Sequence, residues 1–322
     1  MKTMKTLALV SLLAASSAMA QQYPTRNITM LVPYAAGGPT DTVARVVAQR
    51  MTTSLGQTVV VENRPSAGGI LAPEQVKNSK PDGYTILIHH VGMATTPALY
   101  RKLRFDPLSD FDYVGLINDV PMTLVGKRNL PADNFKELRG YIEKNKDKIS
   151  LANAGIGAAS HLCGMLFMSA LQTELLTVPY KGTGPAMNDL VGGQVDLMCD
   201  QTTNTTSQIK GGKIKVYGVT SLKRVPSLPD VPTLDEQGLK GFEVGFWHAL
   251  YGRKGMPKPV LDKLVAALQD AVKDDSVKKR FADLGATTYP PEKATPSALQ
   301  AHLKSEIDKW TPLIKKAGVY AD

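Results

Sequence analysis

Long hydrophobic runs are nearly absent from this 322-residue sequence. One short apolar stretch, residues 7–15, follows Lys2 and Lys5 and precedes Ala-Met-Ala at 18–20, a pattern typical of a cleavable signal peptide over residues 1–20. No later stretch approaches the roughly 18 consecutive apolar residues of a transmembrane helix. We therefore expect an exported, soluble protein of the bacterial periplasm.

Basic runs interleaved with aromatic residues are also missing, which argues against a nucleic-acid-binding protein. The formal net charge is +9, or +7 without Lys2 and Lys5, and basic residues alternate with acidic ones, especially after Lys258. With 43% hydrophobic and 21% charged residues, the composition is that of an ordinary globular protein. A basic surface still attracts anionic ligands. The length suggests two domains or one large α/β domain.

Cysteine is scarce, with only Cys163 and Cys199, which lie 36 residues apart. An even number of cysteines in an oxidising compartment favours a disulfide. Closing that loop would stabilise the protein by about 3–4 kcal/mol in the chain-entropy model. Two alternatives remain: two small buried hydrophobic residues, or a reactive thiol at Cys163 near a helix start.

The rest of the chain is organised around one strand, one loop and one helix. Residues 28–34 predict a buried strand, and the loop of residues 35–41 contains two adjacent glycines. A helix is predicted from Thr42, with Thr40 or Asp41 as its cap. Unpaired N–H groups at such a helix start favour an anion. A tight turn without a ligand is the alternative.

The same order recurs later in the chain. Residues 149–153 predict a strand, residues 154–159 a loop with two glycines, and a helix follows with Ser160 as its cap. Two such helix starts facing one another across a cleft would give one anion two sets of N–H donors. Ser160 and His161 also suggest a hydrolase, but adjacent residues on a helix do not face one another, and no nucleophile elbow surrounds Ser160.

The order of the predicted elements indicates two α/β lobes. Two strand-like runs, residues 113–117 and 122–126 with residues 118–121 between them, lead into a second lobe, and residues 242–251 carry the chain back. A chain of this kind has a two-strand hinge and binds its ligand between the lobes. The predicted division assigns 21–120 plus 248–322 to lobe 1 and 121–247 to lobe 2.

Motifs throughout the sequence resemble the extracytoplasmic solute-binding receptors of the tripartite tricarboxylate transporters, the Bug or TctC family. The similarity covers essentially the whole mature chain, and the motifs are Val32-Pro-Tyr-Ala-Ala-Gly-Gly38, Glu62-Asn-Arg-Pro65, Pro81-Asp-Gly-Tyr84, Ser160-His-Leu162, Val178-Pro-Tyr-Lys-Gly182, Gly192-Gly-Gln-Val-Asp196 and Pro229-Asp-Val-Pro-Thr233. The resemblance implies a two-lobed type II periplasmic-binding-protein (Venus flytrap) fold. It also implies a small organic carboxylate as ligand and membrane transporter subunits as partners.

The resemblance and the departures from it also indicate a set of ligand-binding residues. They are Tyr34, Gly37, Gly38, Thr40, Asp41, His89, His90, Gly157, Ala158, Ser160, His161, Asp200 and Asn204. His89 and His90 point to opposite faces of a strand, so we expect one to be a ligand donor and the other structural. Asp41 is expected to hold its loop rather than contact the ligand. Asp200, followed by a polar loop, would face the far end of the ligand.

The sequence thus predicts a receptor for a small dicarboxylate, with an aromatic one such as terephthalate as an option. We expect no catalytic residues, no cofactor, no metal ion and a monomer. Two alternatives are an exported, hydrolase-like enzyme acting on carboxylates and a ligand-sensing partner of a signalling ectodomain.

Overall fold

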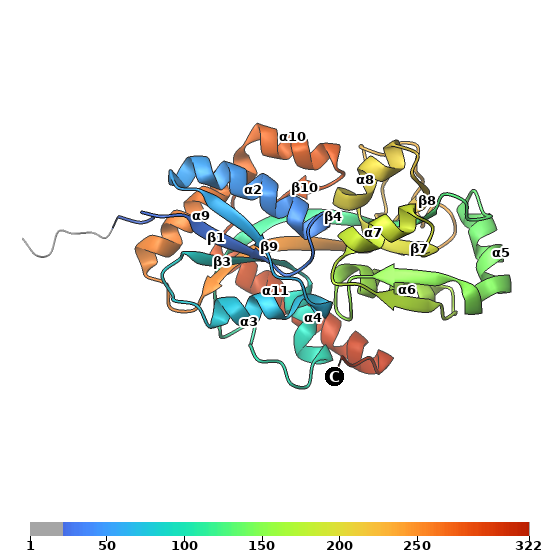
Figure 1. The fold of residues 1–322 in the computed structure, drawn as a ribbon, viewed down its shortest axis with the longest axis horizontal. Helices are drawn as coiled ribbons and strands as arrows, with labels where there is room; N and C mark the ends of the chain where they lie inside the picture. Colours follow the sequence, from blue (N-terminus) through green and yellow to red (C-terminus); the bar gives the residue numbers. More distant parts are fainter. Residues whose placement is uncertain (1–21, 322) are drawn as a thin grey trace, which may run out of the picture.

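The computed structural model describes residues 22–321, so the predicted signal peptide lies outside the described residues. The chain folds into two α/β lobes connected by two long strands, β4 (Phe111–Lys127) and β9 (Gly245–Arg253) (Figure 1). The hydrogen-bonded strand order is β2-β1-β3-β9-β4-β7-β5-β6, with β8 and β10 pairing beside β4. The predicted α/β fold with two lobes and two connecting strands is confirmed.

The first lobe surrounds β1, which pairs in parallel with β2 and β3, while β9 runs antiparallel to β3. Besides parts of β4 and β9, its strands are β1 (Ile28–Val32), β2 (Val59–Asn63), β3 (Thr85–His90) and β10 (Thr287–Thr288). Its helices are α2 (Pro39–Leu55), η1 (Ala67–Gly69), α3 (Leu71–Lys77), α4 (Gly92–Leu99), α9 (Lys258–Lys273), α10 (Asp275–Asp283) and α11 (Pro296–Ala317).

The second lobe is built on the far part of β4, which pairs antiparallel with β7 and β8. Its strands are β5 (Ser150–Asn153), β6 (Leu176–Pro179), β7 (Leu197–Gln201) and β8 (Ile214–Val219). Its helices are α5 (Phe135–Asn145), η2 (Lys146–Lys148), α6 (Ala159–Ala170), α7 (Thr183–Val191) and α8 (Thr202–Lys210).

Helix α2 lies on the sheet because its apolar residues repeat at helical spacing. Val43, Val47 and Met51 are four residues apart and fully buried, so they form one stripe along the helix. They share a core with Leu264 and Leu268 of α9. This packing fixes the direction of α2, and its first turn points toward the second lobe (Figure 1).

Strand β4 differs from the sequence prediction, which placed two strand-like runs within residues 113–126. The structure has one strand of 17 residues, with register shifts against β9 between Tyr113 and Gly115 and between Leu116 and Asn118. Because β9 pairs with this segment, Asn118 is a buried strand residue and not part of a connection between two strands. The predicted lobe boundaries at 120/121 and 247/248 fall inside β4 and β9 and remain a prediction.

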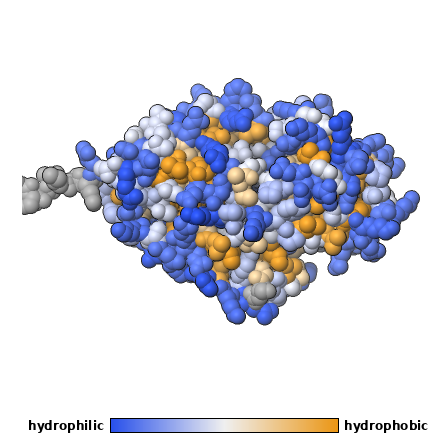
Figure 2. All heavy atoms as spheres, viewed as in Figure 1, coloured by the Kyte–Doolittle hydropathy of each residue, from blue (hydrophilic) through white to orange (hydrophobic). Residues whose placement is uncertain are grey.

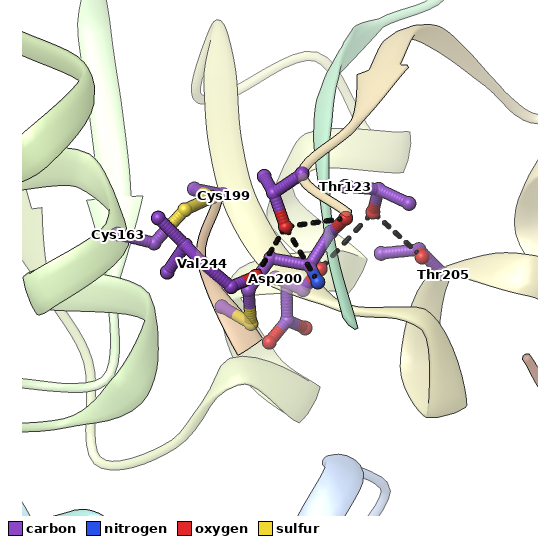
Figure 3. Close-up of a disulfide and its surroundings, with 8 residues drawn as sticks. Thr123, Cys163, Cys199, Asp200, Thr205 and Val244 are labelled. Carbon is purple, nitrogen blue, oxygen red and sulfur yellow. Dashed lines mark hydrogen bonds between the residues drawn. A yellow bond between two sulfur atoms is a disulfide. The ribbon is translucent and has the colours of Figure 1, made fainter. Parts of the chain in front are cut away.

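The two cysteines form the predicted disulfide. Cys163 of α6 is bonded to Cys199 of β7, and both side chains are buried. The disulfide therefore holds the first half of α6 against the central strand of the second lobe. Asp200 follows Cys199 on β7, so the disulfide lies next to a residue predicted for the ligand site (Figure 3).

Helix α8 corrects a second prediction, because residues 200–206 were expected to form a polar loop. Thr202 to Thr206 instead form the buried first half of α8. Threonine hydroxyls bond to distant parts of the chain: Thr205 to Thr123 at 2.8 Å (Figure 3), and Thr202 to the Gly285 carbonyl at 3.1 Å. These tertiary bonds offset the low helix propensity of threonine.

The face of the molecule in Figure 2 is mostly covered by hydrophilic residues, with hydrophobic residues in separate small groups. Lysine and arginine are interleaved with acidic residues, as in the i,i+4 pairs Lys258–Asp262 and Lys279–Asp283. Among residues 22–321, no helix is both long and apolar enough to cross a membrane.

Candidate functional site

A small cavity lies where the two lobes meet. Residues from both lobes line it, and the predicted ligand-binding residues among them are Tyr34, Gly38, Thr40, His90, Ala158, Ser160 and Asp200. The lining residues that the sequence analysis did not select are Pro39, Ala154, Ala159, Thr183 and Gln201. The cavity has a volume of about 20 Å³, which is room for about one water molecule. The lobes are therefore closed around the site.

Direct hydrogen bonds join the two lobes around this cavity. The Ala35 N–H donates to the Lys181 carbonyl at 3.0 Å, and the Tyr100 hydroxyl donates to the Ile156 carbonyl at 3.2 Å. Further bonds between the lobes link Gly68 to Ala154 and Thr95 to Gly157. Most of the acceptors are backbone carbonyls, so closure depends on the two backbones coming close together.

Glycine makes this close approach possible. A Cβ on Gly184, in the first turn of α7, would lie 2.4 Å from the Ala36 carbonyl oxygen of the opposite lobe. A Cβ on Gly182 would lie 2.8 Å from the Ala35 nitrogen, and Gly182 also has a φ of +150°. Both distances are shorter than real Cβ atoms allow, so the contact between the two loops requires glycine.

Four helices begin at the cavity. The lining residues Gly38, Ala158 and Gln201 are the N-cap residues of α2, α6 and α8, and Thr183 is the first residue of α7. None of these four helix starts has a side-chain cap. A helix start exposes N–H groups and a partial positive charge, so four together have the chemistry to hold an anion. No lysine or arginine of the described chain lines the cavity.

The structure corrects both predicted caps. Helix α2 begins at Pro39 with Gly38 as N-cap, so neither Thr40 nor Asp41 caps it. Helix α6 begins at Ala159 with Ala158 as N-cap, and the Ser160 hydroxyl instead accepts a hydrogen bond from the Ala154 N–H at 2.9 Å. In both cases the helix starts before the polar residue.

Asp41 organises the first glycine loop. Its carboxylate accepts hydrogen bonds from the Gly37 N–H at 3.0 Å, from the Asn63 amide at 3.1 Å and from two nitrogens of Arg45. Burial alone would raise the pKa of Asp41, but the hydrogen bonds from Arg45, Gly37 and Asn63 lower it below its usual value. Asp41 and Gly37 do not line the cavity.

His89 and His90 have different surroundings. Nδ1 of His89 accepts from the His90 N–H, so Nε2 carries the proton and donates to the Gly69 carbonyl at 3.3 Å. Nδ1 of His90 accepts from the Gly92 N–H at 3.0 Å, which leaves a protonated Nε2 as a donor. Only His90 lines the cavity, and its ring stacks on Tyr34 at 4.9 Å between centroids.

A third histidine, His248 of β9, connects the cavity wall to the connecting strands. Its Nδ1 donates to the Asn118 side-chain oxygen of β4 at 3.0 Å, and its Nε2 lies 3.3 Å from the Thr40 hydroxyl. Burial lowers the pKa of His89 to about 4 and that of His248 to about 3, and it lowers the pKa of His90 well below its usual value. The three rings are therefore neutral at pH 7.

Ser160, His161 and Gly157 lie around the second glycine loop. His161 accepts from the Gly157 N–H at 3.4 Å and lines a small pocket behind the cavity rather than the cavity itself. Gly157 has a φ of +87°, and its carbonyl accepts from Thr95. Each polar group thus bonds to the loop backbone, and Ser160 and His161 do not bond to one another.

Asp200 is a buried carboxylate in the cavity wall. The Asn204 amide donates to its Oδ2 at 2.6 Å and approaches the Thr183 carbonyl at 3.5 Å. Burial raises the pKa of Asp200 to about 6, although hydrogen bonds from Asn204, the Gln201 backbone and the Thr183 hydroxyl lower it. Asn204 acts through Asp200 and does not line the cavity.

Two of the overlooked residues had signals in the sequence. Thr183 follows Gly182 directly before a helix, which is the same loop-to-helix pattern that identified the other glycine loops. Gln201 is adjacent to the selected Asp200. Ala154 and Ala159 carry no polar side chain, so only the closed geometry shows that they line the cavity.

The chain is similar to a known protein family and to several solved structures. The model of the tripartite tricarboxylate transporter family receptor matches residues 43–319. The solved structure of the periplasmic binding protein BugD is 56% identical, covers 93% of this chain and all of that one, and superposes with a TM-score of 0.90.

Two further solved structures contain ligands. MatC from Rhodopseudomonas palustris, with bound malate, is 39% identical over 91% of this chain and 100% of its own, with a TM-score of 0.86. Another R. palustris protein, solved with adipate, is 31% identical over 92% of this chain and 99% of its own, with a TM-score of 0.87.

Proposed function

The chain belongs to the receptor family of the tripartite tricarboxylate transporters, and from this premise we propose that it captures a small dicarboxylate and delivers it to such a transporter. At the level of class it is a periplasmic solute-binding receptor, and its family and structural neighbours are binding proteins. We propose in addition which ligand it binds, which residues hold that ligand, and that the ligand is delivered to the transporter.

The convergence of four uncapped helix starts on one cavity carries the proposal. The first turns of α2 and α6 line the cavity from opposite lobes, and their N–H groups would hold one carboxylate. Hydrogen bonds from N–H groups to a charged acceptor contribute about 1.5–3 kcal/mol each. Several of them would supply the roughly −8 kcal/mol that a micromolar dissociation constant requires.

Side chains in the cavity wall add neutral donors. Nε2–H of His90 and the Ser160 hydroxyl belong to groups that line the cavity, and Tyr34 packs behind His90. A neutral donor binds a carboxylate without a competing counter-ion, so binding depends on geometry more than on charge. We propose that Tyr34, Gly38, Thr40, His90, Ala158 and Ser160 surround this carboxylate.

A second carboxylate would be held by N–H groups of α7 and α8, whose starts line the same cavity. MatC was solved with malate and the other R. palustris protein with adipate, which are dicarboxylates of four and six carbons. Because the cavity has room for only about one water molecule, every dicarboxylate requires the lobes to separate, the shorter acids least and terephthalate most. Terephthalate is the aromatic dicarboxylate of the test panel.

The test is a thermal-shift screen of the mature protein, unfolded and refolded beforehand to remove any ligand carried through purification. The panel contains succinate, malate, aspartate, citrate, adipate, benzoate and terephthalate, with succinamide as an uncharged control. A ligand at one hundred times its dissociation constant stabilises the protein by about 2.7 kcal/mol. We expect dicarboxylates to raise the melting temperature and succinamide to have no effect. A panel without any shift would refute the proposal.

Delivery needs a separate measurement in cells that contain the transporter membrane subunits. Uptake of the labelled ligand is expected to require this receptor and to stop when the receptor gene is deleted. Uptake that continues unchanged without the receptor would contradict delivery, while leaving ligand capture intact.

A further inference from the structure

Asp200 is difficult to reconcile with a site that binds only carboxylates. Its side chain lies in the cavity wall, and the residue is 1% exposed. Asn204 and the other hydrogen-bond donors around it are neutral, and within residues 22–321 no lysine or arginine forms an ion pair with it. A buried carboxylate without a counter-ion is costly, and a ligand carboxylate beside it would add repulsion.

Gln201, the next residue, presents a second unsatisfied group. Neither the nitrogen nor the oxygen of its side-chain amide has a hydrogen-bond partner in the described chain, although both are buried. The residue lines the same cavity as Asp200. Buried polar groups almost always have partners, so an unpaired amide in a cavity wall indicates a missing partner in the cavity.

Together the two residues offer a defined set of contacts. Asp200 retains acceptor capacity, because a carboxylate has about four lone-pair positions and its neighbours fill only part of them. Gln201 offers one acceptor and two donor hydrogens. A group that donates to Asp200 and lies beside a carboxylate that accepts from Gln201 would give partners to the Asp200 carboxylate and to the Gln201 amide nitrogen.

We propose that Asp200 and Gln201 form a subsite for a hydrogen-bond donor, a hydroxyl or an ammonium group, next to one carboxylate of the ligand. The inference rests on the proposed function and narrows its ligand class from dicarboxylates in general to hydroxy- or amino-dicarboxylates. A hydroxyl would add a hydrogen bond to Asp200, and an ammonium group would also add the positive charge that the surrounding donors lack.

The experiment compares three acids with the same four-carbon skeleton by isothermal titration calorimetry of the wild-type protein. Succinate has no donor, malate has a hydroxyl and aspartate has an ammonium group. We expect malate or aspartate to bind at least about tenfold more tightly than succinate, because the added bond involves a charged acceptor. Whichever of malate and aspartate binds more tightly shows whether the donor is a hydroxyl or an ammonium group.

Two variants test the residues themselves. In Asp200→Asn, the advantage of the donor-bearing acid over succinate is expected to fall below about threefold, since the acceptor loses its charge. In Gln201→Met, binding of the donor-bearing acid is expected to weaken about tenfold, because its carboxylate loses an amide donor. Asp262→Asn removes an exposed carboxylate on α9 and serves as the control. Thermal unfolding verifies that each variant is folded.

The outcomes separate this inference from the proposed function. Equal affinity of the wild-type protein for all three acids, or an advantage that Asp200→Asn leaves unchanged, would overturn the subsite while leaving the dicarboxylate receptor intact. An unchanged affinity in Gln201→Met would remove that residue from the subsite. If no acid of the panel binds the wild-type protein, the subsite fails together with the proposed function.

Discussion

The helices that begin at the cavity differ from three helices that begin elsewhere in how their first turns are capped. Helices α5, α10 and α11 have side-chain caps from Asn134, Asp274 and Thr295, which bond the first N–H groups. Helices α2, α6, α7 and α8 all begin at the cavity and have none. Helices α3, α4 and α9, whose first residues do not line the cavity, also have no side-chain cap, so the absence of a cap alone does not identify a site.

The difference shows that two conditions together define the candidate site. A cap contributes about 1 kcal/mol to stability, so four missing caps leave the protein less stable than it would otherwise be. At the cavity, residues from four helix starts without side-chain caps line one enclosed space shared by both lobes. If these helix starts hold the ligand, as we propose, each lobe alone would bind it only weakly, and ligand binding would favour closure of the lobes.

The largest expected effect comes from removing the covalent bond that holds uncapped α6 to β7. In the double variant Cys163→Ala/Cys199→Ala, the 36-residue loop is no longer closed in the unfolded chain. We expect the free energy of unfolding to fall by about 4 kcal/mol, measured by urea denaturation. An unchanged denaturation midpoint would contradict the role of the disulfide as the anchor of α6.

The disulfide itself is checked by mass spectrometry after alkylation of the denatured protein. Without reductant no label should be added, and with reductant two labels should appear. Two labels without reductant would show that the cysteines are free in the purified protein.

The second largest effect is expected from Gly184→Ala at the start of α7. The added methyl would lie 2.4 Å from the Ala36 carbonyl oxygen in the closed form only. Overpacking of this kind costs on the order of 3 kcal/mol, so ligand affinity is expected to fall about 100-fold while stability without ligand is retained. Calorimetry measures the affinity, and small-angle X-ray scattering measures whether ligand still makes the protein more compact.

Gly140→Ala is the matched control for that variant. Gly140 lies inside the capped helix α5, and a Cβ there would meet nothing within 4 Å. Both substitutions favour the helix in the same way. If the two variants bind ligand equally well, the contact between Gly184 and Ala36 does not limit closure.

The third prediction concerns the pH dependence of stability at the start of α8. The pKa of Asp200 is raised from 3.8 to about 6, so its contribution to stability is fully present below pH 3.8 and is lost as the pH rises through 6. The loss amounts to about 3 kcal/mol by pH 7.5. Asp119, whose pKa is also raised to about 6, contributes in the same direction.

The variant Asp200→Asn isolates this contribution. Denaturation of the wild-type protein and the variant from pH 4 to pH 7.5 gives a difference in stability that should grow with pH in favour of the variant. Asp41, whose pKa is lowered, is present in both proteins and cancels in the comparison. A difference that does not change with pH would contradict the raised pKa of Asp200.

The sequence predicts the features that depend on neighbours along the chain. The glycine loops, the strand before each and the helix after each follow from local composition, and the pairing of Cys163 with Cys199 follows from their number and compartment. Features set by distant contacts were predicted incorrectly. Asn118 is typical of a turn, yet β9 pairs with it and β4 continues. Thr205 is typical of a loop, yet its bond to Thr123 places it in a buried helix.

The cavity residues likewise divide into those that a local sequence pattern predicts and those that depend on distant contacts. Tyr34, Gly38 and Ala158 were identified because each belongs to a recognisable loop. Gln201 was missed because its role depends on which side of β7 meets the opposite lobe. Thr183 was missed because α7 contacts the first lobe only when the two lobes close. A cavity between lobes is set by closure, which no local sequence pattern specifies.

The smallest effect is expected from exchanging caps between the two sets of helices. In Ala158→Ser, a hydroxyl at the N-cap of α6 would accept from the first-turn N–H groups that the ligand carboxylate is proposed to use. Stability without ligand is expected to rise by about 1 kcal/mol, while ligand affinity falls about tenfold. Thermal unfolding and calorimetry measure these two opposite changes in the same variant.

Asn134→Ala removes the cap of α5 and gives the converse case. Its side chain bonds the Glu137 N–H at 3.0 Å, far along the chain from the cavity residues. Stability is expected to fall by about 1 kcal/mol with no change in affinity. If capping α6 leaves affinity unchanged, or uncapping α5 lowers it, then the free N–H groups at the cavity are not reserved for a ligand. Opposite signs in the two variants would establish that α6 forgoes a stabilising cap because its first turn is a binding surface.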